Sequence, residues 1–281
     1  MNTDPFLGFS SKEILAGSPV LFGAPLDLTC TYRNGTGKAP QHIRVASDSI
    51  ETYSPLLDRD LTDIRFSDMG DLDLPGLPLE EALETVREAA SKILQNGAKP
   101  LCMGGEHTLT WPIAQAVKDA YPEILILHLD AHSDLRETYE GSSVNHATVM
   151  RLVSREIGAD RLVQLGIRAG TREEFNWMYE HGTLMQWTRG RQKEFRKRIA
   201  DSPVYLSLDL DVLDPACLPG TGNPESGGWF YEDMEHLFRI LDGVNLVAAD
   251  VVELNPDPDP SGASTITAAK IVRELLLILG K

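Results

Sequence analysis

The sequence predicts an α/β fold, a three-layer αβα sandwich with a mainly parallel central sheet. Short, continuous apolar runs alternate along the chain with amphipathic segments of helical periodicity, as strands and helices do in this class. Because the apolar runs are hydrophobic at consecutive positions, helices should cover both faces of the sheet. Neither a low-complexity linker nor an internal repeat divides the 281 residues, so we expect one domain over residues 1–281.

The expected elements follow from these two patterns. Seven apolar runs are the expected strands: Val20–Phe22, Ile64–Phe66, Pro100–Met103, Ile124–Leu129, Leu162–Leu165, Val204–Leu210 and Leu246–Val252. The clearest expected helix, Leu79–Asn96, follows Pro78 and precedes Gly97, residues that suit a helix start and a left-handed helix end. A second helix is expected over Ala263–Leu279. Further helices are expected to follow Thr110, Thr171 and Tyr231.

The charge of the chain limits its partners. The net charge is −16, from 42 acidic and 26 basic residues. Such a charge repels phosphate backbones and anionic membrane surfaces, and the longest apolar runs, such as Leu275–Leu279, are too short to span a bilayer. Neither a nucleic acid nor a membrane is therefore an expected partner. The same charge would attract a small cationic molecule, although it would equally serve only to keep the protein soluble.

The cysteines indicate a reducing compartment. Cys30, Cys102 and Cys217 are odd in number and widely spaced, and no CxxC motif occurs. This usage argues against a disulfide framework and against a zinc-thiolate site. Residues 1–17 contain acidic side chains and no long apolar stretch, so we do not expect a secretory signal there. A cytoplasmic protein with reduced thiols is the simplest interpretation.

The strongest chemical motif follows the expected strand Ile124–Leu129, which runs directly into Asp130, His132 and Asp134. Extended backbone sends residues i, i+2 and i+4 to the same side. We therefore expect two carboxylates and an imidazole to converge at one strand end. The alternative is a polar turn whose residues alternate by chance.

Two more strand ends carry similar residues. Asp209 and Asp211 lie at the end of the expected strand Val204–Leu210, among neighbours that are almost all apolar. Buried, unpaired carboxylates are unfavourable by several kcal/mol, so these two need a cation or a change of protonation. His107 comes after the glycine pair at 104–105 at the end of another expected strand. A lone histidine is usually structural, but this position favours a ligand.

These residues form a candidate ligand set of two imidazoles and four carboxylates: His107, Asp130, His132, Asp134, Asp209 and Asp211. The set is too rich in oxygen for a structural zinc site and contains no thiolate. Four negative charges favour two divalent cations over one, and hard ligands favour manganese, magnesium or iron(II). Two such ions, roughly 3.5–4 Å apart, can share a water and lower its pKa toward neutrality.

The motifs as a group resemble the ureohydrolases, the family of arginases and agmatinases, over nearly the whole chain. The resemblance is carried by Gly-Gly-Glu-His at 104–107, Asp-Ala-His-Ser-Asp at 130–134 and Ser-Leu-Asp-Leu-Asp-Val-Leu-Asp-Pro-Ala at 207–216. The segments 219–228 and 251–256 extend it. It implies an arginase-like fold in a single ureohydrolase domain and a homo-oligomer, either a trimer or a hexamer.

The resemblance also implies roles for the ligand set. It implies two Mn²⁺ ions, each held by a histidine and an aspartate and both bridged by two further aspartates: His107 with Asp134, His132 with Asp211, and Asp130 and Asp209 as the bridges. A hydroxide bridging the ions would attack the guanidinium carbon of a small cationic substrate. Collapse of the tetrahedral intermediate would release urea and an amine. Asp134 would also accept a hydrogen bond from the hydroxide.

Two residues outside the ligand set would contact the substrate. Glu253 follows the expected strand Leu246–Val252, and a carboxylate there can hold a planar guanidinium by paired hydrogen bonds. His146 matches the family position of a mobile histidine that shuttles protons, and histidine titrates near neutral pH. The alternatives are a surface glutamate and a loop histidine without a role. His128 shares side-chain parity with Asp130 and is either its supporting partner or merely structural.

Agmatine, hydrolysed to putrescine and urea, is the expected substrate. Segments 31–37, 53–61 and 134–136 resemble agmatinases more than arginases. The distal ammonium of agmatine should meet carboxylates or carbonyls. The candidates are Glu140, Glu173 and Glu174, each of which is better explained as a solvated surface residue. Guanidinobutyrate is the second choice, because its carboxylate would need a cation such as Arg33 or Arg136.

Other activities stay open at this point. Arginine and formiminoglutamate are further ureohydrolase substrates. A catalytically silent, ligand-binding relative is an alternative of a different class, although the whole ligand set is present. A two-metal phosphohydrolase could use the same carboxylates, but no basic cluster for a phosphate accompanies the motifs.

Overall fold

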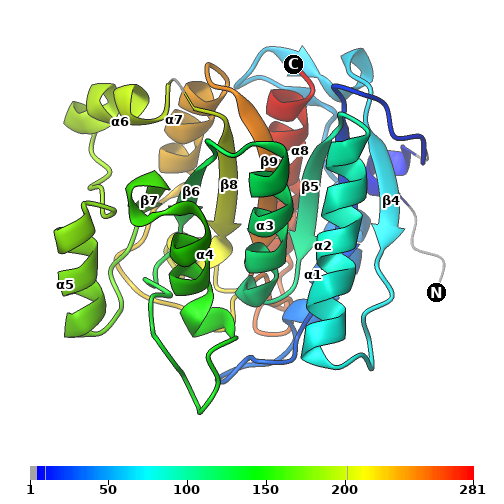
Figure 1. Ribbon diagram of the computed structural model, residues 1–281. Coiled ribbons are helices and arrows are strands. Elements are labelled where there is room, and N and C mark those ends of the chain that lie inside the picture. Colours follow the sequence, from blue (N-terminus) through cyan, green and yellow to red (C-terminus); the bar gives the residue numbers. More distant parts are fainter. Residues whose placement is uncertain (1–4, 10, 201) are drawn as a thin grey trace.

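A seven-stranded sheet lies at the centre of the computed structural model, which describes residues 5–9, 11–200 and 202–281 (Figure 1). Its strand order is β4-β1-β5-β9-β8-β6-β7, and every neighbouring pair is parallel. The strands of this sheet are β1 (Pro19–Ala24), β4 (Ser67–Asp71), β5 (Lys99–Gly104), β6 (Leu125–Leu129), β7 (Leu162–Leu165), β8 (Val204–Asp209) and β9 (Leu246–Val252). A separate antiparallel ribbon pairs β2 (Tyr53–Ser54) with β3 (Arg59–Asp60).

Helices cover both faces of the sheet, so the predicted three-layer αβα architecture is confirmed (Figure 1). One face is covered by α1 (Ala39–Ser47), α6 (Gln192–Ile199), α7 (Tyr231–Leu241) and α8 (Ala263–Leu279). The other is covered by α2 (Leu79–Gln95), α3 (Thr110–Ala120), α4 (Val149–Ile157) and α5 (Arg172–His181).

Two apolar cores result, one on each side of the sheet. Along β5, Leu101 and Met103 belong to one core, whereas Cys102 belongs to the other. Every residue of β1 and β8 is buried. Strands that are covered on both faces need apolar residues at consecutive positions, which explains why continuous runs rather than alternation marked them in the sequence.

The prediction of a strand at Ile64–Phe66 is wrong. The strand there is β4, Ser67–Asp71, and Phe66 instead packs against the ring of Phe9, with 4.7 Å between the ring centroids. Hydropathy misses β4 because its buried position 68 is an aspartate. The charge of Asp68 is compensated by an ion pair with the buried guanidinium of Arg44, whose Nε lies 2.8 Å from a carboxylate oxygen of Asp68. The other six strands and the predicted helices match to within a few residues, while α1, α4 and α6 were not predicted.

The topology brings four chemically important strand ends together. β5, β9, β8 and β6 are consecutive neighbours in the sheet and are parallel, so their carboxyl ends lie at the same edge. Ligands of open parallel sheets bind outside this edge. No helix in the described ranges is both long and apolar enough to cross a membrane.

Candidate active site

Two glycines carry the chain from β5 to His107. Gly104 ends the strand, and Gly105 passes so close to the loop after β1 that a Cβ on it would lie 1.9 Å from the carbonyl oxygen of Leu26. No other residue fits without moving that backbone. The turn places His107 at the start of a short 3₁₀ segment before α3, where only 1% of its surface is exposed.

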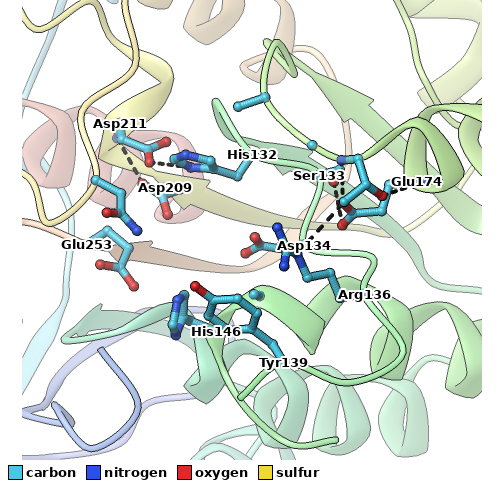
Figure 2. Close-up of a pocket in the computed structure, with 15 residues that line it drawn as sticks. His132, Ser133, Asp134, Arg136, Tyr139, His146, Glu174, Asp209, Asp211 and Glu253 are labelled. Carbon is cyan, nitrogen blue, oxygen red and sulfur yellow. Dashed lines mark hydrogen bonds and ion pairs between the residues drawn. The ribbon is translucent and has the colours of Figure 1, made fainter. Parts of the chain in front are cut away.

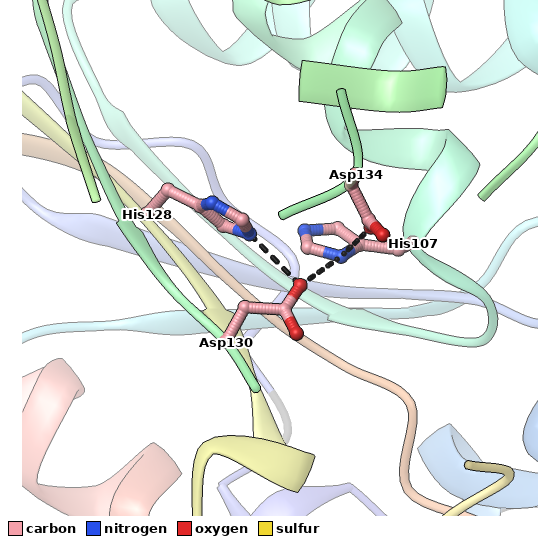
Figure 3. A group of neighbouring side chains, drawn as sticks. All are labelled: His107, His128, Asp130 and Asp134. Carbon is pink, nitrogen blue, oxygen red and sulfur yellow. Dashed lines mark hydrogen bonds and ion pairs between the residues drawn. The ribbon is translucent and has the colours of Figure 1, made fainter. Parts of the chain in front are cut away.

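Three carboxylates gather around His107, and Figure 3 shows two of them, Asp130 and Asp134. Its Nδ1 lies 3.1 Å from Asp130 Oδ2, 3.1 Å from Asp134 Oδ2 and 3.3 Å from Asp209 Oδ2. Within the described part of the chain, this buried nitrogen nevertheless makes no hydrogen bond of normal geometry. A nitrogen surrounded by oxygens, yet not hydrogen-bonded to them, is the donor arrangement that a cation between them would use.

The other nitrogen of His107 explains why Nδ1 is available. Nε2 lies 3.0 Å from Ser207 Oγ, and that hydroxyl donates to Asp250 Oδ1 at 3.0 Å. Since the serine proton goes to the carboxylate, Ser207 accepts from Nε2–H. This leaves Nδ1 of a neutral imidazole with its lone pair directed at the carboxylates. The residues therefore fit a divalent metal.

A second group lies next to the first and shares Asp130 with it. His132 Nδ1 is 2.8 Å from Asp211 Oδ2 and 3.5 Å from Asp130 Oδ1. Asp130 thus points one oxygen toward each histidine, as a carboxylate bridging two ions would. The backbone N–H of Asp211 donates to Asp209 Oδ1 at 2.8 Å, which links the two groups a second time.

The charges of the two groups demand compensation. Burial and the neighbouring carboxylates raise the pKa of Asp209 and of Asp211. Burial lowers the pKa of His107, but the surrounding aspartates outweigh it and raise that pKa well above its usual value. The pKa of His132 is also raised, because Asp211 and Asp130 outweigh its burial. The site accordingly favours bound positive charge, either protons or metal ions.

Backbone strain marks two of the residues. Asp134 has φ +51° and Glu253 has φ +64°, in the left-handed region that favours glycine. Non-glycine residues there cost roughly 1–3 kcal/mol and cluster at functional sites. The sequence argument that extended backbone would align residues 130, 132 and 134 is wrong, because β6 ends at Leu129. The loop, and not strand alternation, brings the three side chains together.

Asp130 has a buried partner of its own. His128 Nε2 lies 2.9 Å from Asp130 Oδ2, and Gln164 donates to His128 Nδ1 at 3.1 Å. Because Gln164 Nε2 also donates to the carbonyl of Ser133, it is a donor at His128, and Nε2–H must face Asp130. His128 is thus the partner that its parity with Asp130 suggested.

A pocket of about 260 Å³ opens onto these groups (Figure 2). Its size suits a small molecule. Glu253 lines it at the end of β9, and one of its oxygens accepts the backbone N–H of His107 at 2.8 Å. Burial raises the pKa of Glu253 to about 8. A cation bound beside Glu253 would favour its charged carboxylate over the neutral acid. His146 lines the same pocket.

Comparison with known proteins shows the family to which the chain belongs. The model of the Arginase family matches residues 18–278. The chain belongs to the arginase family. An agmatinase from Bacillus anthracis is 41% identical over 96% of this chain and 97% of its own length. A guanidinobutyrase from Pseudomonas aeruginosa is 34% identical over 96% and 89%, respectively. A crystal structure from Clostridium difficile superposes with a TM-score of 0.90 at 38% identity, over 94% of this chain and 97% of that one.

As a member of the arginase family, the chain is a ureohydrolase. Its pocket has a rim of polar side chains beyond the carboxylates (Figure 2). Arg136 lies over the ring of Tyr139, with 4.6 Å between the guanidinium carbon and the ring centroid. Its Nε is 3.9 Å from Glu174 Oε2. Asn223, from the glycine-rich segment 219–228, lines the pocket as well, so that segment forms part of the wall.

Glu174 is not the solvated surface residue that the sequence favoured. It is 4% exposed and accepts hydrogen bonds from Ser133 Oγ at 2.8 Å, Leu135 N at 3.1 Å and Thr171 N at 2.7 Å. It therefore holds the loop that contains Asp134. By contrast, Glu173 and Glu140 are exposed and do not line this pocket.

Three supporting residues were assigned no role from the sequence, although one of them, Ser207, begins the motif at 207–216. Ser207, Asp250 and Gln164 lie within strands β8, β9 and β7 and are fully buried, so their roles appear only once neighbouring strands are paired.

Of the two arginines considered as anchors for a substrate carboxylate, Arg136 lines the pocket. Arg33 lines a different depression.

Proposed function

We propose that this ureohydrolase hydrolyses agmatine to putrescine and urea with two Mn²⁺ ions bound at the strand ends. The observation that carries the proposal is the buried Nδ1 of His107, which faces three carboxylate oxygens at 3.1–3.3 Å, while the backbone N–H of the same residue donates to Glu253. A site with this charge suits both divalent ions and a cationic substrate.

The two groups supply a ligand set for the ions. His107 with Asp134 would hold one, His132 with Asp211 the other, and the two remaining aspartates, Asp130 and Asp209, would serve both. When bound, the ions supply Lewis acidity that activates the attacking water near neutral pH. An oxygen-rich set without thiolate favours manganese over a thiophilic metal.

The residues of the chain would orient the substrate and move protons. Glu253 uses one oxygen on the N–H of His107, and its other oxygen is available for a guanidinium N–H. Holding the planar guanidinium fixes its carbon for attack by water. The bond from this carbon to the alkyl nitrogen then breaks, and His146 would supply a proton to the departing amine.

Agmatine is favoured over other guanidino compounds by similarity and by charge. The chain is more similar to the Bacillus anthracis agmatinase than to the Pseudomonas aeruginosa guanidinobutyrase, at 41% against 34% identity. Besides three carboxylates of the candidate metal ligands, the pocket is lined by two others, Glu174 and Glu253, and one guanidinium, so a dication is better accommodated than the zwitterion guanidinobutyrate.

A substrate panel tests the proposal. Urea release should be measured for agmatine, arginine, guanidinobutyrate and formiminoglutamate after loading with Mn²⁺, Mg²⁺ or Fe²⁺. We expect agmatine with Mn²⁺ to give the highest kcat/KM. A tenfold preference, about 1.4 kcal/mol, for another compound would overturn the substrate assignment and leave the ureohydrolase class intact. Phosphatase activity, or metal binding without urea release from any compound, would instead support the phosphohydrolase or the silent relative.

Guanidinobutyrate is the second candidate, and Arg136 is the observation that favours it. Its guanidinium lines the pocket and could pair with a carboxylate. Arg136→Leu separates the two substrates. If agmatine is the substrate, its kcat/KM should stay within about threefold, because Glu174 and Tyr139 occupy Arg136 already. If guanidinobutyrate is the substrate, loss of the ion pair should lower kcat/KM by about tenfold or more.

Three further properties remain predictions. We propose a single ureohydrolase domain, a cytoplasmic location and a homo-oligomer that is a trimer or a hexamer. Light scattering coupled to size-exclusion chromatography would measure the mass against the 31.0 kDa chain. A monomer would contradict the proposed assembly.

A further inference from the structure

His146 shares one hydrogen-bonding partner between its ring and its backbone. Its Nδ1 lies 3.2 Å from Thr29 Oγ1, and its backbone N–H donates to the same oxygen at 3.2 Å. Thr29 comes from the loop after β1, 117 residues away in sequence. The ring of Tyr139 also meets the His146 ring edge to face, with 5.8 Å between centroids (Figure 2).

The direction of the proton at Thr29 is decided by Glu106. The hydroxyl of Thr29 is 2.8 Å from Glu106 Oε1, and the other carboxylate oxygen accepts the backbone N–H groups of Leu28 at 2.7 Å and Thr29 at 2.6 Å. A carboxylate has no proton to give, so the hydroxyl donates to it. Thr29 Oγ1 then has only lone pairs for His146, and Nδ1 must carry a proton to bond with it.

We propose that Thr29, oriented by Glu106, is a positioning residue that keeps Nδ1 of His146 protonated and leaves Nε2 as the atom that gains and loses the catalytic proton. The inference rests on the proposed role of His146 in proton transfer. Both the neutral imidazole and the imidazolium keep the Nδ1–H bond to Thr29, so the ring need not change its contacts during a turnover. A ring without this acceptor would divide between two tautomers.

The turn at 104–107 would then position both the carboxylate cluster around His107 and, through Thr29, the ring of His146. Glu106 is 0% exposed and points to the loop at 28–29, whereas the next residue, His107, points into the carboxylate cluster. Since the turn is packed against Leu26 at Gly105, the two side chains are held in a fixed relation. Through Thr29, the backbone that holds a metal-ligand candidate also positions the proton carrier.

The tautomer of His146 can be observed without any activity. The full chain, labelled with ¹⁵N-histidine and loaded with diamagnetic Mg²⁺, should show the neutral His146 ring as the Nδ1–H form by NMR, with the signal assigned by its loss in His146→Gln. Thr29→Val should shift the population toward Nε2–H, whereas Thr29→Ser should not. A dominant Nε2–H tautomer in the unmodified protein would overturn the proposal.

Kinetics provide the second measurement. Thr29→Val should lower kcat for agmatine by about tenfold with little change in KM, because general acid-base steps contribute at least this much. Thr29→Ser should restore most of kcat. Thr108→Val is the matched control, since its hydroxyl lies 3.2 Å from Thr29 Oγ1 but, among the described residues, forms no hydrogen bond with His146.

A double variant separates positioning from a general structural effect. In the His146→Gln background, Thr29→Val should lower kcat no further. An equal loss in both backgrounds would show that Thr29 acts on the fold and not through His146, which overturns the proposal. If the unmodified protein releases no urea from any guanidino compound, the proposed function fails, and the NMR measurement alone decides the tautomer.

Discussion

The floor and the rim of the pocket are built in different ways. The floor consists of the six candidate metal ligands and Glu253, which lie at the ends of four neighbouring strands or in the segments directly after them. The rim, made of Arg136, Tyr139, Glu174 and Asn223, comes from loops and from the start of α5. Under the proposed function, the floor would set the reaction class, because it would hold the metal ions and the guanidinium. The rim would set which guanidino compound fits.

Within the rim, Glu174 is as buried as the floor aspartates, so a contrast in exposure separates the floor from Arg136. His107 and Asp130 are buried and each touches several floor residues, whereas the side chain of Arg136 is 40% exposed. Groups held in place by many partners lose more function when altered than exposed groups with few partners. Changes on the floor should therefore cost orders of magnitude in activity, and changes on the rim should cost much less.

The largest effect is expected at the shared carboxylates. Asp130→Asn and Asp209→Asn each remove a charge that faces His107, so urea release should fall by more than about 100-fold and bound Mn²⁺ should decrease. Metal content by mass spectrometry and urea release are the measurements. Full activity with two ions retained in both variants would exclude the proposed bridging role and, with it, the distinction between floor and rim.

Glu253→Gln should have the next largest effect. Glutamine keeps an oxygen for the N–H of His107 but loses the charge that pairs with a guanidinium. Losing a charge-assisted interaction of this kind should lower kcat/KM for agmatine by between about tenfold and a hundredfold, while two ions remain bound. Kinetics unchanged within error would mean that the substrate does not reach this carboxylate.

Ser207→Ala tests whether the hydrogen bond that orients the His107 ring affects metal binding. The variant removes the acceptor of His107 Nε2–H, so the affinity for Mn²⁺ should fall by about 10–100-fold while kcat at saturating metal is largely retained. Ser154→Ala is the matched control, because that buried hydroxyl donates only to a carbonyl of its own helix. The same metal affinity in both variants would contradict the proposed orientation of His107.

The sequence predicted the floor better than the rim, for a physical reason. Continuous apolar runs mark strands that are covered on both faces, and polar residues directly after such runs identify the sheet edge. This located Asp130, His107 and Asp209 before any contact was known. It failed for the polar strand β4, whose Asp68 is neutralised by Arg44, a residue of another element.

The rim and the buried supports depend on partners that are distant in the chain. Asp250 is one more polar residue in a strand until β8 and β9 pair and bring it to Ser207. Glu174 looks like the exposed Glu173 beside it, and only the folded loop shows that one of the two is buried. Local pattern carries no information on such contacts, because they arise from topology.

These two adjacent glutamates give the smallest and sharpest test. Glu174→Gln leaves one of the three donors that face it without an acceptor, which should cost about 1–3 kcal/mol of stability. At roughly 2–4 °C per kcal/mol, Tm should fall measurably, and kcat should decrease by at most about tenfold because Asp134 lies in the loop that Glu174 holds.

Glu173→Gln is the control for that variant, since the same chemical change at an exposed position one residue away should alter neither Tm nor kcat. Thermal unfolding and urea release are measured on both variants with the same metal. Equal Tm and kcat in the two variants would mean that Glu174 does not stabilise the loop. The left-handed conformation of Asp134 would then depend on its contacts with the floor alone.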